Sequence, residues 1–142
     1  GAPAHAAVRP RGGVLRPPLR PPGGAFARPW CYLRAMKAVQ FSRFGAPDEV
    51  ADVVDLPDPP APGPGQALAE FLCAPINPAD LLNLQGLYGV VPPLPSIGGL
   101  EGVGRVVAVG PGVANVRPGD RVLIGGGAWR ERQVVPAAGL FP

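Results

Sequence analysis

Histidine and cysteine are scarce in this sequence. Its 142 residues include one histidine, His5, and two cysteines, Cys31 and Cys73. Neither a Cys-x-x-Cys nor a His-Glu-x-x-His spacing occurs, so the sequence offers no ligand set for a transition metal, and we expect no metal site. Two cysteines are too few for a disulfide scaffold. Cys73 lies in an apolar run and is expected to be a small buried side chain.

Long hydrophobic runs and a basic surface stripe are missing as well. No apolar segment approaches the roughly 20 residues of a membrane-spanning helix, so we expect no membrane insertion. No basic stripe with interleaved aromatic residues occurs, which argues against nucleic-acid binding. The net charge of +3 arises in residues 1–35, which hold six arginines and no acid, whereas residues 36–142 hold seven basic and ten acidic residues.

Residues 1–35 consist mainly of Pro, Gly, Ala and Arg without periodicity, a composition typical of irregular chain. Three interpretations stay open: a mitochondrial transit peptide (although serine is absent), a nucleic-acid-binding tail, or a segment that is not translated, since Met36 is the only methionine. We expect a disordered leader over 1–35 and one folded domain over 36–142. The predicted location is the cytoplasm, or the mitochondrion if the leader is a transit peptide.

Proline and glycine are abundant, with 22 and 21 residues, but hydrophobic residues make up 46% of the chain. This combination favours turns and short strands over general disorder. The patterns predict turns at 45–48, 110–112 and 117–120, irregular chain over 87–97, and strands over 37–43, 50–56, 66–74, 102–109, 121–124 and 132–135. The sequence therefore predicts a mainly β, barrel-like domain with one short helix.

The helix is predicted over residues 77–86. Asn77 can cap its N-terminus, Pro78 suits the first helical position, and Asp80 places a negative charge in the first turn. Gly86 is positioned to end the helix in a left-handed conformation.

A glycine cluster at Gly98, Gly99, Gly102 and Gly104 does not form a dinucleotide-binding fingerprint. Val107 occupies the third glycine position, and the cluster precedes a strand instead of a helix. These glycines are expected to permit a close backbone approach or a bulge.

Four residues are candidates for a functional site, each with a structural alternative. Tyr88 follows the predicted helix in a loop, where it packs on the barrel or donates a proton. Asn77 caps the helix or binds a ligand. Glu101 is either solvated or the partner of a nearby base, and Trp129 belongs to the core or to a pocket.

Four segments after Met36, in order, carry a family resemblance. They read A-P-I-N-P-A-D-L-L-N-L-Q-G-L-Y-G, L-P-S-I-G-G-L-E-G-V-G-R-V-V-A-V-G, R-P-G-D-R-V and G-A-W-R-E-R. The chain resembles the N-terminal part of the medium-chain dehydrogenase/reductase superfamily. Within it, the chain is most similar to the zinc-free branch of mitochondrial-type 2-enoyl thioester reductases.

The resemblance implies a GroES-like barrel beside an NADPH-binding Rossmann domain. Asn77 and Leu100 stand at positions that hold zinc ligands in metal-dependent members, which implies no zinc here. Tyr88 matches the proposed proton donor, Asn77 a contact to the nicotinamide or the substrate carbonyl, and Trp129 a pocket wall. With Glu101, Trp129 is assigned to substrate binding.

The implied activity is NADPH-dependent reduction of the C=C bond of trans-2-enoyl thioesters, by a homodimer when full length. No Rossmann unit occurs before Pro142, so the chain is expected to be a truncated, inactive part of the enzyme. Leu100 replaces an asparagine of enoyl reductases, which leaves a quinone reductase or another alcohol-dehydrogenase-like member open. A stand-alone barrel that binds a partner without chemistry is a further alternative.

Overall fold

The computed structural model describes residues 35–140, so the predicted leader lies outside the described residues except for Ala35. The elements in chain order are β1 (Ala35–Phe41), α1 (Pro47–Val50), β2 (Asp52–Pro57), β3 (Gln66–Cys73), α2 (Pro78–Leu84), β4 (Ser96–Ile97), β5 (Glu101–Val109), β6 (Arg121–Gly125), β7 (Arg132–Pro136) and the 3-10 helix η1 (Ala137–Gly139). The domain is mainly β, as predicted.

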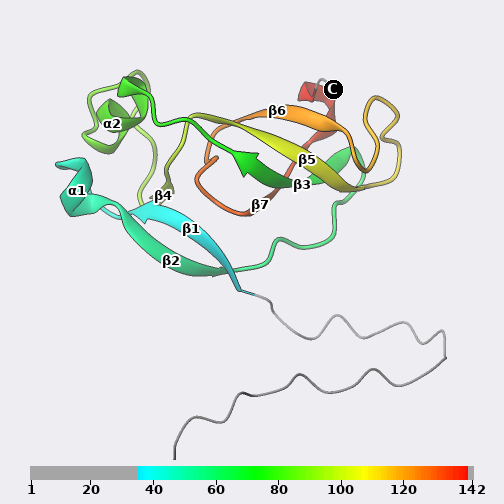
Figure 1. Ribbon diagram of the computed structural model, residues 1–142, viewed down its shortest axis with the longest axis horizontal. Coiled ribbons are helices and arrows are strands. Elements are labelled where there is room, and N and C mark those ends of the chain that lie inside the picture. Colours follow the sequence, from blue (N-terminus) through cyan, green and yellow to red (C-terminus); the bar gives the residue numbers. More distant parts are fainter. Residues whose placement is uncertain (1–34, 141–142) are drawn as a thin grey trace, which may run out of the picture. The chain divides into compact units, whose positions relative to one another are not determined.

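The strands form two antiparallel sheets (Figure 1). One has three strands in the order β2-β1-β4, and the other has four in the order β6-β5-β3-β7. The β3–β5 pairing shifts its register between Leu68 and Ala69 and again between Phe71 and Cys73. Such shifts increase the local twist and bend of a sheet, as closure into a barrel requires.

A short segment before β7 joins the two sheets. On one side, the Val39 N–H donates to the Trp129 carbonyl at 2.8 Å and the Glu131 N–H donates to the Lys37 carbonyl at 3.1 Å. On the other side, the Phe71 N–H donates to the Glu131 carbonyl at 2.8 Å. Because residues 129–131 bond both β1 and β3, the sheets share a continuous hydrogen-bonded path, which is the predicted GroES-like barrel.

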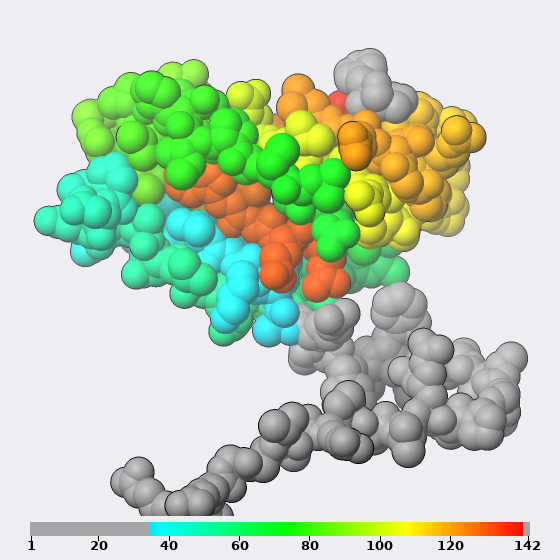
Figure 2. Space-filling view, in the orientation of Figure 1, coloured from blue at the N-terminus to red at the C-terminus, as the bar shows by residue number. Residues whose placement is uncertain are grey.

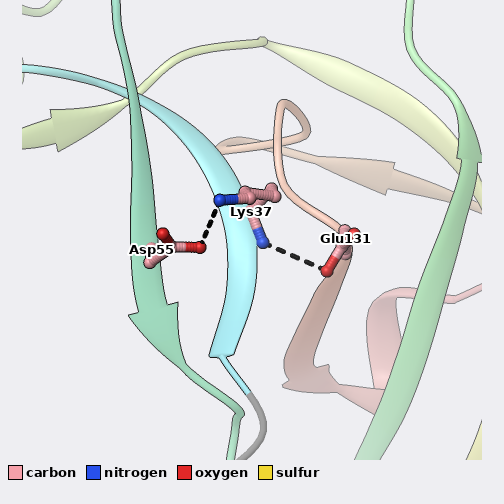
Figure 3. A network of polar contacts seen from close by, with 3 residues as sticks. All are labelled: Lys37, Asp55 and Glu131. Atoms are coloured by element: carbon pink, nitrogen blue, oxygen red, sulfur yellow. Dashed lines mark hydrogen bonds and ion pairs between the residues drawn. The ribbon is translucent and has the colours of Figure 1, made fainter. Parts of the chain in front are cut away.

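The Glu131 side chain adds one further hydrogen bond at this junction, and Lys37 also forms an ion pair with Asp55 inside the three-stranded sheet (Figure 3). The Lys37 ammonium lies 2.6 Å from a carboxylate oxygen of Asp55, and the Lys37 backbone N–H donates to the Glu131 carboxylate at 3.0 Å. The ion pair is more than half exposed on both sides, at 61% and 59%. Exposed pairs of this kind contribute at most about 1 kcal/mol. This pair joins β1 to β2, so the link between the two sheets consists of the backbone bonds and the Glu131 carboxylate.

The larger hydrophobic cluster lies against the four-stranded sheet. Its strands alternate buried and exposed positions, as expected for strands with one face on a core. The buried members are Ala67, Ala69, Val106, Val116, Val122, Ile124, Val135, Ala137 and Leu140.

A smaller cluster forms where β1 and both helices meet. Phe41, Val50 and Leu84 are buried there, and Phe44 and Trp129 pack against them. The rings of Phe41 and Phe44 have centroids 6.1 Å apart at an interplanar angle of 55°, a tilted arrangement favoured for aromatic pairs. This cluster anchors α2 to the barrel.

Most predicted elements are confirmed, including the helix, which runs over Pro78–Leu84 with Gly86 at a φ of 73° behind it. The chain turns at 45–48 as predicted, but the turn continues as the short helix α1 over Pro47–Val50, which was not predicted. Pro47 at its start and two acids in its first turn favour a helix beginning. Within the predicted irregular stretch, Ser96 and Ile97 pair with β1 as the two-residue strand β4.

The prediction that Cys73 is buried is also wrong, since its side chain is exposed. Cys73 ends β3 directly after the register shift that follows Phe71, and it lies opposite Val103. A register shift turns the following side chain to the other face of a sheet. The thiol therefore faces away from the core.

Candidate functional site

The N-terminus of α2 is held by a buried carboxylate. Asp80 is 1% exposed, and its Oδ2 accepts the backbone N–H of Asn77, the N-cap residue, at 2.7 Å. Its Oδ1 accepts the backbone N–H of Leu100 at 2.7 Å. The predicted helix start is confirmed. The bond to Leu100, which ties α2 to the glycine-rich segment, was not predicted.

Asn77 and Glu101 lie together in the structure. The Asn77 side-chain amide donates from Nδ2 to Oε1 of Glu101 at 3.2 Å. Glu101 is exposed at the start of β5. Its carboxylate thus accepts a hydrogen bond from an amide, while both groups stay accessible to a ligand.

Trp129 lies beside the same segment. Its indole N–H donates to the carbonyl of Pro75 at 3.1 Å, two residues before the helix cap. The indole covers Gly98 and Gly99, where an added Cβ would lie 2.3 Å and 2.5 Å from ring atoms. The predicted close approach at these glycines is confirmed, because any side chain there would collide with the tryptophan.

These contacts define the candidate site. Three hydrogen bonds connect residues 75–80, residues 98–101 and Trp129, namely Asp80 to Leu100, Asn77 to Glu101, and Trp129 to Pro75. The structure therefore brings together three of the four predicted site residues, although they are far apart in the sequence.

Tyr88 is not joined to that group. It lies in the loop after α2, 45% exposed, and no hydrogen bond of its hydroxyl is found within residues 35–140. Gly86 and Gly89 bracket it with φ angles of 73° and 51°, which only glycine adopts without strain. The two glycines let the loop change direction on both sides of the tyrosine.

Exposed hydrophobic side chains are concentrated in residues 72–94, the part of the chain that includes α2. We call this group the α2 apolar surface, and it comprises Leu72, Ile76, Leu81, Leu82, Leu87, Val90, Val91 and Leu94. Ile76 is 72% exposed, Leu87 70% and Val90 91%. Figure 2 shows this part of the chain, in green, at the surface of the domain. Contiguous exposed apolar surface marks a site for a ligand or another protein surface.

Arg130 was not predicted as a site residue, although it follows Trp129 directly. Its Nε donates to the carbonyl of Gly127 at 2.7 Å. Partial burial lowers the pKa of the Arg130 guanidinium below its ordinary value through desolvation. The side chain closes the glycine turn that leads into Trp129, and nothing in its sequence context indicated this contact.

Within the described part of the chain, no three His, Cys, Asp or Glu side chains lie close enough to hold a metal ion. None of its helices is both long and apolar enough to cross a membrane.

Residues 63–142 match the family model of the alcohol dehydrogenase GroES-like domain. The chain belongs to this family. The resemblance to the N-terminal part of the medium-chain dehydrogenase/reductase superfamily is thereby confirmed.

Curated relatives include oxidoreductases and a vesicle protein. The chain is 43% identical over 102 residues to bovine mitochondrial enoyl-[acyl-carrier-protein] reductase, covering 70% of this chain and 27% of the relative. It is 43% identical over 108 residues to the rat synaptic vesicle membrane protein VAT-1 homolog, covering 75% of this chain and 27% of the relative. The chain thus spans about a quarter of the length of these relatives.

Solved structures agree with the fold. A putative NADPH:quinone reductase from Bacillus thuringiensis is 36% identical with a TM-score of 0.68, over 77% of this chain and 33% of that one. A quinone oxidoreductase from Pseudomonas syringae is 42% identical with a TM-score of 0.62, over 74% of this chain and 32% of that one. Among the relatives and solved structures are medium-chain oxidoreductases named as enoyl reductases and as quinone reductases.

Proposed function

We propose that this barrel is part of a zinc-independent, NADPH-dependent reductase that reduces the C=C bond of trans-2-enoyl thioesters. The observation that carries the proposal is the meeting of Asn77, Glu101 and Trp129 at the start of α2. It occurs in a chain that is 43% identical to a mitochondrial enoyl-[acyl-carrier-protein] reductase over 102 residues.

The nicotinamide end of NADPH fits the donor set at this place. A carboxamide both donates and accepts hydrogen bonds, and Asn77 and Glu101 offer one side chain of each kind within 3.2 Å of each other. Either group can exchange its present bond for one to the ligand, since Glu101 is exposed. When bound, NADPH supplies the hydride for Cβ of the substrate. Its phosphates would bind outside this barrel, which has no glycine fingerprint.

Tyr88 completes the reduction in this proposal. After hydride addition at Cβ, the electron pair of the C=C bond resides on Cα and the thioester oxygen as an enolate. A phenol is a proton donor at neutral pH, so Tyr88 gives its proton to Cα and regains one from water. Tyr88 is half-exposed between two glycines with positive φ angles, so a substrate can reach it from solvent.

The α2 apolar surface suits the remainder of such a substrate. Leu87 and Val90 flank Tyr88 and are 70% and 91% exposed. Apolar area contributes about 25 cal/mol per Å² when it is removed from water. An acyl chain laid on these residues would be bound next to the proposed proton donor.

The proposal is tested with the full-length product of the gene, by following NADPH oxidation with trans-2-enoyl-CoA. Replacing Tyr88→Phe removes the proton donor and is expected to lower kcat about 100-fold or more. Val53→Ala serves as the matched control, because Val53 is 73% exposed on β2 and outside the site. An unchanged kcat for Tyr88→Phe would contradict the role of Tyr88 as proton donor and leave it a packing role.

Quinone reduction is the second candidate, favoured by the identities of 36% and 42% to proteins named as quinone reductases. The same full-length product decides between them through kcat/KM for trans-2-enoyl-CoA and for a series of quinones. A higher kcat/KM for trans-2-enoyl-CoA than for every quinone supports enoyl reduction, and a higher kcat/KM for a quinone supports quinone reduction. No turnover of either would favour a barrel that binds a partner without chemistry.

The isolated chain is proposed to be inactive, because it carries Asn77 and Tyr88 but no recognisable phosphate-binding motif for NADPH. Residues 1–142 incubated with NADPH and trans-2-enoyl-CoA should show no turnover above the protein-free rate. The full-length product is proposed to be a homodimer, which light scattering would measure. Measurable turnover by the isolated chain would contradict the first statement.

The cellular location is proposed to be the cytoplasm, with the mitochondrion as the alternative. The names of the enoyl reductase relatives support the mitochondrial alternative. A fluorescent protein fused behind residues 1–35 distinguishes the two by its distribution in cells.

A further inference from the structure

Asp80 is the only charged side chain that is buried among residues 35–140. None of the ion pairs in this range includes it. Its two oxygens instead accept two backbone N–H groups, of Asn77 and Leu100, both at 2.7 Å. A carboxylate without a cationic partner is costly to bury, so these short bonds must offset its loss of hydration.

The two N–H groups belong to the two halves of the candidate site. Oδ2 holds the backbone of Asn77 itself, and Oδ1 holds Leu100, the residue directly before Glu101. The Asn77 amide reaches the Glu101 carboxylate at 3.2 Å across the same gap. One planar carboxylate thus fixes the distance between the backbone at Asn77 and the backbone at Leu100.

In the described chain, no backbone–backbone hydrogen bond links residues 98–100 to α2. The carbonyls of Gly98, Gly99 and Leu100 all accept N–H groups from residues 126–129, at 2.9, 3.0 and 2.7 Å. The Leu100 N–H is the group of this segment that is bonded to α2. Without the Asp80 carboxylate, the segment would remain attached to residues 126–129 and to Val39, and Trp129 would still reach Pro75, but the direct bond between Leu100 and α2 would be lost.

We propose that Asp80 is a positioning residue that holds Asn77 and Glu101 in register with each other. The inference rests on the proposed function in so far as these two side chains bind the nicotinamide or the substrate. Loss of the carboxylate would separate the two side chains while leaving the four-stranded sheet intact, since Asp80 contacts neither β6 nor β7 through a hydrogen bond.

The chain offers a matched control. Asp120 also accepts the N–H of the residue three positions earlier, Arg117, at 2.9 Å from Oδ2. Asp80 differs in its second bond, which reaches 20 residues along the chain to Leu100. Comparing Asp80→Asn with Asp120→Asn therefore separates the long-range tie from the local turn bond.

The test is NMR spectroscopy of the 142-residue chain. In Asp80→Asn, one of the two oxygens becomes an NH₂ group that cannot accept a hydrogen bond. We expect the backbone amide proton that then faces the NH₂ group, that of Leu100 or that of Asn77, to move upfield and to exchange with solvent at least about 10-fold faster, and the side-chain NH₂ resonances of Asn77 to shift as the contact with Glu101 is lost. Asp120→Asn should change neither signal.

A folded Asp80→Asn chain with unchanged Asn77 side-chain resonances would overturn the inference and leave Asp80 as a helix cap. If Asp80→Asn does not fold, Asp80→Glu keeps the charge but moves it by one methylene, and displaced Asn77 side-chain resonances are then expected. Unchanged resonances in Asp80→Glu would overturn the inference as well. Neither measurement uses substrate or NADPH, so its outcome is independent of whether the full-length product reduces enoyl thioesters.

Discussion

The four-stranded sheet buries its hydrophobic side chains on one face, whereas the α2 region leaves many of its hydrophobic side chains exposed. The sheet packs small and branched side chains into one cluster, and Ala67, Ala69 and Val106 are at most 1% exposed. Around α2, Leu84 is equally buried, but most of the exposed large hydrophobic side chains of the described chain lie between residues 72 and 94. The sheet therefore buries its apolar side chains within the domain, whereas the α2 region leaves apolar side chains available to a ligand or another protein surface.

The two regions also differ in what holds them. The strands of the sheet are joined by continuous ladders of backbone bonds, which tolerate most changes on the exposed face. The α2 region is held by the small cluster around Leu84 and by single side chains, since Asp80, Asn77 and Trp129 each supply one bond or pair of bonds to another segment. A site held by single side chains can be altered without unfolding the barrel.

The variant with the largest expected effect on stability is Leu84→Ala. Leu84 is 1% exposed in the smaller cluster, and its truncation is expected to lower the free energy of unfolding by about 2–5 kcal/mol. Leu82→Ala, on the exposed side of the same helix at 39% exposure, should cost about 1 kcal/mol or less. Chemical denaturation of both variants measures the difference, and equal losses would show that α2 is not anchored as described.

A second comparison uses two glycines with positive φ. Gly99 has a φ of 87°, and an added Cβ would lie 2.5 Å from the Trp129 ring. Gly99→Ala is expected to cost about 2–4 kcal/mol, from backbone strain and overpacking together.

Gly112→Ala is its control, because Gly112 has a φ of 78° but no atom within 4 Å of the added Cβ. Only the strain of about 1–2 kcal/mol should remain there. A similar midpoint of thermal unfolding for both variants would contradict the close packing of Trp129 on the glycine segment.

The smallest expected effects come from two ion pairs. Asp58 and Arg132 are 2.9 Å apart with side chains only 22% and 25% exposed, so Asp58→Asn should cost about 1 kcal/mol. Asp55 lies closer to Lys37, at 2.6 Å, but both are about 60% exposed. Asp55→Asn should therefore cost about 0.5 kcal/mol or less. Denaturation at low and high salt checks the order, which would be reversed if distance outweighed exposure.

Local patterns predicted the fold well. Alternation identified the strands, and Asn77, Pro78 and Gly86 marked the helix, because these signals act over a few residues. Features that depend on contacts between distant segments could not be predicted from the sequence. The exposure of Cys73 depends on a register shift against β5. The second bond of Asp80 depends on a segment 20 residues away, which no local pattern contains.

The candidate site was predicted in part for the same reason. Asn77, Glu101 and Trp129 were selected one by one, and their convergence depends on hydrogen bonds between segments that lie 24 and 54 residues apart in the sequence. Tyr88 was selected for its loop and for a family resemblance, and its role stays a prediction.

The most direct test of the proposed chemistry is the reduction of a trans-2-enoyl-CoA by the full-length gene product with NADPH in D₂O, followed by NMR of the saturated product. We expect one solvent-derived deuterium at Cα and none at Cβ, because NADPH supplies a non-exchangeable hydride to Cβ while Cα receives its proton from an exchangeable donor, proposed to be the Tyr88 hydroxyl. Deuterium at Cβ, or the absence of any saturated thioester, would contradict it.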